Sequence, residues 1–115
     1  MLKRFSHVMI FARRHAETVR WYVDALGFEI DYHAPGEYAS LHHRELGRLA
    51  VHAAADDADI GRGPQPYFLC EDLDATLAGL EAAGAKVGEP RREGESPRFS
   101  HFADPEGNVW GVEEL

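Results

Sequence analysis

The sequence has one cysteine, no long apolar run and few basic residues. The single cysteine, Cys70, excludes an intramolecular disulfide, and its apolar neighbours Phe68 and Leu69 predict a buried, unreactive thiol. No apolar stretch approaches membrane-spanning length, and the first residues lack the apolar core and small-residue cleavage site of a secretory signal. We therefore expect a cytoplasmic protein that does not bind a membrane.

The scarcity of basic residues argues against nucleic acid as a partner. Twelve Lys and Arg residues stand against 20 Asp and Glu residues, which gives a formal net charge of −8 at pH 7. Nucleic-acid phosphates need clusters of basic side chains, whereas this acidity is compatible with a cationic ligand. The 115 residues, 44% of them hydrophobic, suffice for one globular domain with a modest core.

Hydrophobic periodicity predicts the same order of elements twice: a strand, a helix and three further strands. In the first half these are a strand at 6–12, a helix at 14–27 that ends at a glycine, and strands at 28–34, 38–44 and 48–54. In the second half they are a strand at 67–73, a helix at 72–84, and strands at 85–90, 98–103 and 108–114.

The two halves also resemble each other in sequence, since DALGFEI at 24–30 matches EAAGAKV at 81–87. We predict an α+β fold in which two βαβββ modules form curved mixed sheets around a cavity. A single domain would span residues 1–115. Its modules would cover about 1–55 and 65–115, joined by a linker at about 56–64 that is rich in charged residues, Gly and Pro.

A sheet that is covered by one helix leaves its other face free to bind a ligand. Alternation along the strands places Val8, Ile10, Leu49 and Val51 beneath the first helix. The residues that point the other way are His7, Met9, Phe11, Ala50 and His52 in the first half, and Phe68, Cys70, Val109, Gly111 and Glu113 in the second. These residues are the predicted lining of the cavity, although core packing would explain Met9, Phe11 and Phe68 equally well.

Three segments resemble those of a known superfamily. His7 stands 15 residues before Tyr22 and 20 before Gly27, in HVMIFARRHAETVRWYVDALGFEI. This segment, DLDATLAGLEAAGAKV and the closing DPEGNVWGVEE are similar to the vicinal oxygen chelate superfamily, which includes glyoxalase I, bleomycin-resistance proteins, fosfomycin-resistance enzymes and extradiol dioxygenases. The resemblance covers nearly the whole chain and implies the paired-module fold, but it does not settle the activity.

The resemblance also implies where a metal would bind, because metal-dependent members take ligands from the first, fourth, fifth and eighth strands. His7 falls at the first of these positions and His52 near the second, where glyoxalases tend to carry Glu. His and Glu side chains suit divalent Zn, Ni, Mn or Fe.

The other two ligand positions are poorly filled. The fifth-strand position falls between Pro64 and Tyr67, where only Gln65 could ligate a metal. The eighth-strand position is Gly111, and Glu113 lies two residues further on the same face. The sequence thus keeps two of the four ligands, while three protein ligands are typical of catalytic zinc.

Three functions remain open. The first is a small-molecule-binding protein of the bleomycin-resistance type that has no catalytic metal and no assigned catalytic residue. The second is a metal-dependent lyase or isomerase of the glyoxalase I type that uses His7, His52 and Glu113. The third, ranked lowest, is an extradiol dioxygenase. Beside these three functions stands an alternative without activity, a dimeric domain with a vestigial cavity.

Two further expectations concern the remaining histidines and the oligomeric state. His15, His33 and His101 belong to no constellation and are expected to be structural or exposed. His42 and His43 are adjacent on a strand and must point to opposite faces. Free strand edges and the resemblance favour a homodimer.

Overall fold

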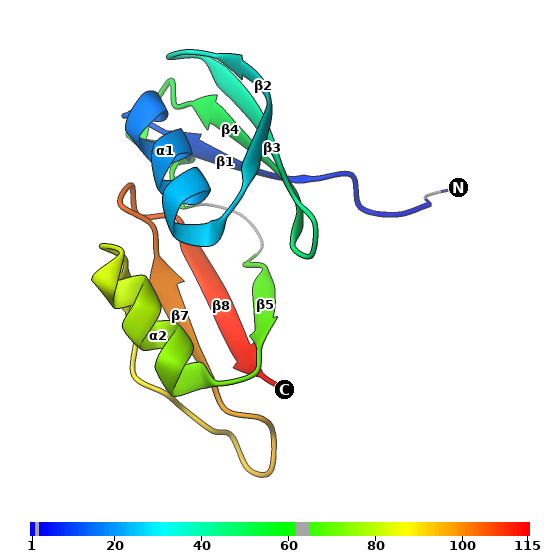
Figure 1. Ribbon diagram of the computed structural model, residues 1–115, viewed down its shortest axis with the longest axis vertical. Helices are drawn as coiled ribbons and strands as arrows, with labels where there is room; N and C mark the ends of the chain where they lie inside the picture. Colours follow the sequence, from blue (N-terminus) through cyan, green and yellow to red (C-terminus); the bar gives the residue numbers. More distant parts are fainter. Residues whose placement is uncertain (2, 62–64) are drawn as a thin grey trace. The chain divides into compact units, whose positions relative to one another are not determined.

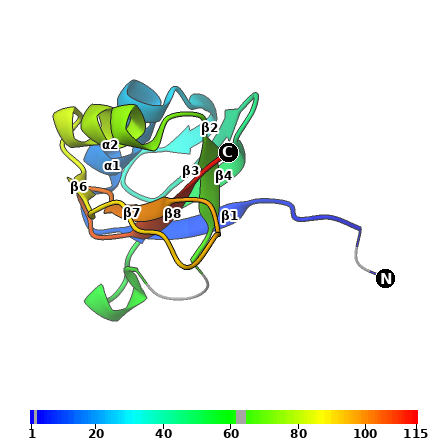
Figure 2. The same ribbon diagram turned by 90° about the horizontal axis from the view of Figure 1, so that it is seen from below.

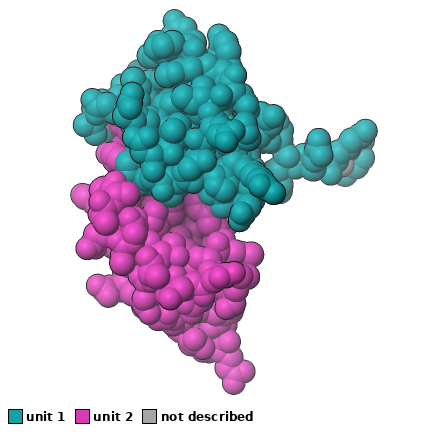
Figure 3. Space-filling model, viewed as in Figure 1, with its two compact units in different colours: residues 1–60 teal, residues 61–115 magenta. Residues whose placement is uncertain are grey.

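The computed structural model describes residues 1, 3–61 and 65–115, which form two compact units, Met1–Ile60 and Gly61–Leu115 (Figure 3). The predicted α+β class is confirmed, because each unit holds a four-stranded mixed sheet and one α-helix. Residues 62–64 of the expected linker lie outside the described residues. Within the described parts of the chain, no helix is long and apolar enough to cross a membrane.

Unit 1 is the first βαβββ module (Figure 1). Its sheet has the order β1-β4-β3-β2, in which β1 runs parallel to β4 and the other neighbours are antiparallel. Its elements are β1 (Val8–Ala12), α1 (His15–Leu26), β2 (Glu29–Ala34), β3 (Tyr38–His43), β4 (Gly47–Ala53) and the 3₁₀ helix η1 (Asp57–Asp59).

Unit 2 repeats this topology with the order β5-β8-β7-β6, and β5 runs parallel to β8. Figure 2 shows α2 and the β7–β8 pair as two layers of this unit. Its elements are β5 (Tyr67–Cys70), α2 (Leu73–Ala82), β6 (Lys86–Val87), β7 (Phe99–Ala103) and β8 (Val109–Glu114).

The core of unit 1 lies between α1 and one face of its sheet. Ile10, Leu49 and Val51 are buried there as predicted, together with Val19 and Tyr22 of the helix. His15 is also buried, and its Nε2 atom lies 2.9 Å from the main-chain oxygen of Val51. Val8 was expected in the same core, but it stands at the start of β1 and is 37% exposed.

Asp104 organises the tight turn between β7 and β8. Its Oδ1 atom accepts hydrogen bonds from the amides of Glu106 and Asn108, both at 2.9 Å, and its Oδ2 atom accepts one from Asn108 Nδ2 at 3.0 Å. Gly107 completes the turn with φ +100°, a conformation that side chains disfavour. Asn108 Oδ1 in turn accepts a hydrogen bond from the amide of Gly61, which fastens the start of unit 2 to this turn.

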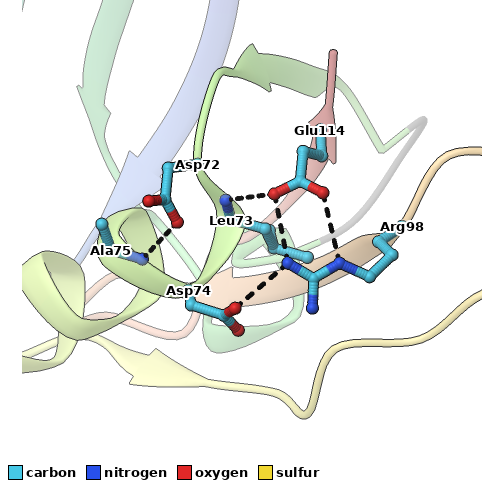
Figure 4. A network of polar contacts seen from close by, with 6 residues as sticks. All are labelled: Asp72, Leu73, Asp74, Ala75, Arg98 and Glu114. Carbon is cyan, nitrogen blue, oxygen red and sulfur yellow. Dashed lines mark hydrogen bonds and ion pairs between the residues drawn. The ribbon is translucent and has the colours of Figure 1, made fainter.

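Glu114 and Arg98 connect the end of β8 to the start of α2 (Figure 4). Glu114 accepts hydrogen bonds from the Leu73 amide at 2.7 Å and from Nε and Nη2 of Arg98 at 3.2 and 3.1 Å. Arg98 also donates to Asp74 at 3.1 Å. Asp72 caps the helix by accepting a hydrogen bond from the Ala75 amide. The first turn of α2 is therefore held by carboxylates, which suit the positive end of the helix dipole.

Acid is expected to weaken unit 2 through Glu114. The hydrogen bonds from Arg98 and from the Leu73 amide hold the pKa of Glu114 below its usual range. A carboxyl whose pKa is lowered by folding stabilises the native state at neutral pH, and this contribution is lost as the pH falls through the folded-state pKa. The Glu114→Gln variant should therefore show a smaller fall in urea midpoint between pH 7 and pH 3 than the parent chain.

The matched control is Glu95→Gln, which removes an exposed glutamate. This control should keep the parent's dependence of the urea midpoint on pH. Parallel pH curves for the parent chain and Glu114→Gln would show that the Arg98–Glu114 contact does not contribute to stability.

Candidate functional site

The face of the unit 1 sheet that points away from α1 carries the residues that alternation assigned to it. The parallel register pairs Met9 with Ala50 and Phe11 with His52, so these four residues share one face. Met9 and His52 are exposed and Phe11 is half-buried, while Ala50 is buried. We call this surface the uncovered face of unit 1. That it lines a cavity stays a prediction.

Aromatic rings form a row across the uncovered face of unit 1. The ring of His52 lies 5.7 Å from that of Phe11 and 6.1 Å from that of Tyr38, and Tyr38 lies 6.3 Å from Tyr32. The four rings come from four different strands. Ring pairs at this spacing are mutually stabilising and offer flat apolar surfaces to a ligand.

A charged group lies on the same face, about four residues away from the aromatic row along strands β3 and β4. His42 pairs with Arg48 in the register of β3 and β4. Asp31 accepts a hydrogen bond from Arg48 Nη1 at 2.8 Å, and its other oxygen lies 2.7 Å from His42 Nδ1. Glu29 lies 3.2 Å from His42 Nε2. Each carboxylate of this group therefore has a basic partner within the unit.

His7 and His52 do not lie side by side. Because His52 pairs with Phe11 in the parallel register, it lies four residues further along the sheet than His7, which corresponds to about 13 Å. His7 Nδ1 is within 3.0 Å of Ser6 Oγ, and His52 Nδ1 is within 2.7 Å of the main-chain oxygen of Ala53. This arrangement does not suit two ligands of one metal ion, whose bonds to histidine nitrogen are about 2 Å long.

The expected orientation of β5 is wrong. Strand pairing aligns Tyr67 with Gly111, which leaves Phe68 on the opposite face of the sheet. There, Phe68 stacks on Trp110 at 5.1 Å and on Phe102 at 6.3 Å, beneath α2. The physical reason is the burial of a large aromatic side chain against two others, which outweighs any preference for a ligand face.

The same register places Cys70 with Phe68, because residues two apart on a strand share a face. The face of the unit 2 sheet that points away from α2, here called the uncovered face of unit 2, includes three of the predicted residues and four that were not predicted. The three predicted residues are Val109, Gly111 and Glu113. The four that were not predicted are Tyr67, Leu69, Phe99 and His101.

The ring of Tyr67 lies directly over Gly111. A β-carbon at position 111 would overlap this ring, so Tyr67 occupies the space that a side chain of residue 111 would need. The Tyr67 hydroxyl and His101 Nε2 are 2.8 Å apart and form a hydrogen bond, and the His101 ring lies 6.0 Å from that of Phe99. An aromatic platform therefore covers the place where the family resemblance puts a carboxylate ligand.

A pocket of about 340 Å³ opens beside this platform. Glu113 stands on the same strand as Gly111 and projects from the same face. The loop between β6 and β7 contributes the remaining wall, in which Ser96 donates a hydrogen bond to the main-chain oxygen of Glu93. The lining residues are Tyr67, Glu93, Ser96, Pro97, Phe99 and Glu113.

The described residues contain no group of three or more His, Cys, Asp or Glu side chains that could hold a divalent metal ion. Gln65 is exposed and precedes β5, and Pro64 of the same predicted ligand position lies outside the described residues. The platform over Gly111 leaves no room for a ligand from that residue.

Sequence reasoning missed Tyr67, Phe99 and His101. Alternation shows which residues of a strand share a face, but it does not show which of the two faces a helix covers. A glycine between bulky residues of a predicted strand was the available signal, because glycine within a strand often marks the close approach of another group.

Comparison with known proteins relates the chain to one family and to several solved structures. Residues 4–112 match the family model described as "Glyoxalase/Bleomycin resistance protein/Dioxygenase superfamily". A search of curated proteins found no match.

Among solved structures, the bleomycin-binding protein of the bleomycin-producing Streptomyces verticillus, complexed with copper(II)-bleomycin, is similar with a TM-score of 0.76. It shares 20% identity over 100% of this chain and 99% of its own. Lactoylglutathione lyase from Agrobacterium tumefaciens has a TM-score of 0.75 and 19% identity, over 98% and 94% of the two chains. The fosfomycin resistance protein FosX from Listeria monocytogenes has a TM-score of 0.80 and 14% identity, over 100% and 95%. At these identities the likeness shows the fold alone.

Proposed function

Because the chain belongs to the glyoxalase/bleomycin resistance protein/dioxygenase superfamily, we propose that it binds a small molecule without using a catalytic metal. The superfamily fold also serves lyases and fosfomycin resistance proteins, so the fold does not choose between binding and catalysis. The choice depends on the residues of the site.

The observation that carries the proposal is the Tyr67 ring over Gly111. The position that would hold a metal carboxylate is glycine, and its space is filled by an aromatic ring that His101 orients. A flat ring beside a pocket of about 340 Å³ suits stacking against a small organic molecule. The row of Phe11, His52 and Tyr38 on the uncovered face of unit 1 offers a second surface of the same kind.

The first test is metal loading. Untagged protein is dialysed against Mn²⁺, Ni²⁺, Zn²⁺ or Fe²⁺ and then against buffer, and bound metal is measured by mass spectrometry. We expect far less than one ion per chain, and no difference between the parent chain and His7→Ala. One ion per chain that is lost in His7→Ala would instead support the metal-dependent lyase or isomerase.

The second test is ligand binding by the metal-free protein, measured by calorimetry with copper(II)-bleomycin and a panel of small aromatic compounds. A ligand that binds the parent chain should bind Tyr67→Ala at least tenfold more weakly, which corresponds to the loss of a stacked ring. Phe5→Ala, which removes an exposed aromatic ring before β1, is the matched control and should bind normally.

We also propose a homodimer, since each sheet has two edge strands that could pair with a second copy, β1 and β2 in unit 1 and β5 and β6 in unit 2. Light scattering coupled to size-exclusion chromatography would give the mass in solution, and a monomer at all concentrations would reject this part of the proposal.

A further inference from the structure

The pocket of unit 2 also indicates the charge of its ligand. Given the proposed binding function, on which this inference rests, we propose that the pocket takes an organic cation. Its positive group would lie against the Glu113 carboxylate, and its apolar body would lie against the rings of Tyr67 and Phe99.

Glu113 is a half-buried carboxylate without a partner among the residues that the structure describes. It lies between Leu69 and Phe99 in the register of the sheet, so apolar side chains flank it on both neighbouring strands. Across the described chain, no side chain or amide forms a hydrogen bond or ion pair with its carboxylate. A carboxylate that loses part of its water without gaining a partner raises the free energy of the folded protein.

The other acidic side chains that project from the strands have partners, in contrast to Glu113. Asp31 on β2 is bound by Arg48 and His42, and Glu29 lies against the same histidine. Glu114, the neighbour of Glu113 in the chain, is bound by Arg98. Glu113 therefore stands out among these carboxylates as the one that a ligand cation could neutralise.

The other residues that line the pocket also favour a positively charged ligand. Its lining includes a second carboxylate, Glu93, and no Lys, Arg or His of the described part of the chain. The faces of Tyr67 and Phe99 carry negative electrostatic potential and attract cations at short range. An anionic ligand would meet two carboxylates without any compensating basic group, and its binding would be opposed by repulsion and by loss of water.

The aromatic lining selects an organic cation rather than a metal ion. A hard metal ion prefers several oxygen ligands in regular geometry, and none of the described residues form a cluster of three ligating side chains. A substituted ammonium or a similar delocalised cation needs one carboxylate and ring faces, which the pocket has.

The experiment is an NMR titration of the full chain labelled with ¹⁵N, using three probes that share a phenyl ring and differ in charge: benzyltrimethylammonium, benzyl alcohol and benzoate. We expect the cation to bind about tenfold more tightly than the alcohol and benzoate to bind most weakly. Shifts should map to residues 67, 93–99 and 111–113. The preference for the cation over the alcohol should disappear in Glu113→Gln and should persist in Glu113→Asp, which keeps the charge.

Glu95→Gln is the matched control, because Glu95 lies in the same loop as Glu93 but does not line the pocket. It removes one negative charge and should leave the preference intact. The same spectra show whether each variant is folded, and since Glu113 has no partner to lose, Glu113→Gln should fold normally.

Several results would overturn the inference: equal affinity for the cation and benzoate, a preference that survives in Glu113→Gln, shifts that map elsewhere, or no binding of any probe. If benzyl alcohol binds at these residues as tightly as the cation does, the charge inference fails but the proposed binding function stands. Failure of the proposed function would appear separately, as stoichiometric metal in the loading experiment.

Discussion

Replacing Asp104 with alanine is expected to lower the free energy of unfolding by about 3–5 kcal/mol. Asp104 is 3% exposed, and its carboxylate accepts hydrogen bonds from the amides of Glu106 and Asn108 and from Asn108 Nδ2. Its removal leaves the amides of Glu106 and Asn108 without their acceptor in a site that excludes water. Since a protein of this size is stabilised by only about 5–15 kcal/mol, the loss should be plain in urea denaturation followed by circular dichroism.

Asp104→Asn tests the cause of this loss. The amide oxygen of asparagine can replace Oδ1, but its NH₂ group meets the donor Nδ2 of Asn108 where Oδ2 had accepted a bond. We expect Asp104→Asn to be less destabilised than the alanine variant but clearly weaker than the parent. A loss below about 1 kcal/mol in the alanine variant, within the range of ordinary surface substitutions and their error, would contradict this account of the turn.

Phe68→Ala is expected to cost about 2–3 kcal/mol, while Tyr67→Ala, one residue earlier, should cost less than about 1 kcal/mol. Phe68 is half-buried and stacks on Trp110 and Phe102, so its removal leaves a void under α2. Tyr67 is 48% exposed on the opposite face, and its hydroxyl forms a hydrogen bond with His101. Chemical denaturation of both variants under the same conditions measures the difference.

Comparing the stability losses of Phe68→Ala and Tyr67→Ala distinguishes the two possible orientations of β5. If β5 had the orientation that alternation suggested, with Phe68 toward the ligand, Tyr67 would be the residue in the core and the order of the two losses would be reversed. The emission of Trp110 gives a second measurement, because only Phe68→Ala should change the surroundings of that indole. Comparable losses in both variants would contradict the structure at this strand.

The order of the elements and much of the first module could be read from the sequence. The spacing of Val19 and Tyr22 predicts a helix face, and Gly27 ends that helix with φ +79°. Ile10, Leu49 and Val51 occupy alternate positions of their strands, which places them on one face of the sheet, and all three are buried. These features are local, since each depends on residues a few positions apart and on the periods of helices and strands.

The candidate site depended on contacts between residues far apart in the sequence. The orientation of β5 follows from its register with β8, more than 40 residues later, and that register alone brings Tyr67 over Gly111. The separation of His7 from His52 likewise follows from the pairing of β1 with β4. A one-residue change of register reverses every side chain of a strand.

The sequence by itself therefore determined the repeated βαβββ order and the α+β class. It also determined that position 111 is a glycine where the family resemblance implies a metal-ligating carboxylate. The tertiary structure decided what fills the space above that glycine and which carboxylate is left without a partner. The physical reason is that strand periodicity is encoded within each strand, whereas the choice of face and of neighbour is made only when separate strands pair and bury their largest side chains together.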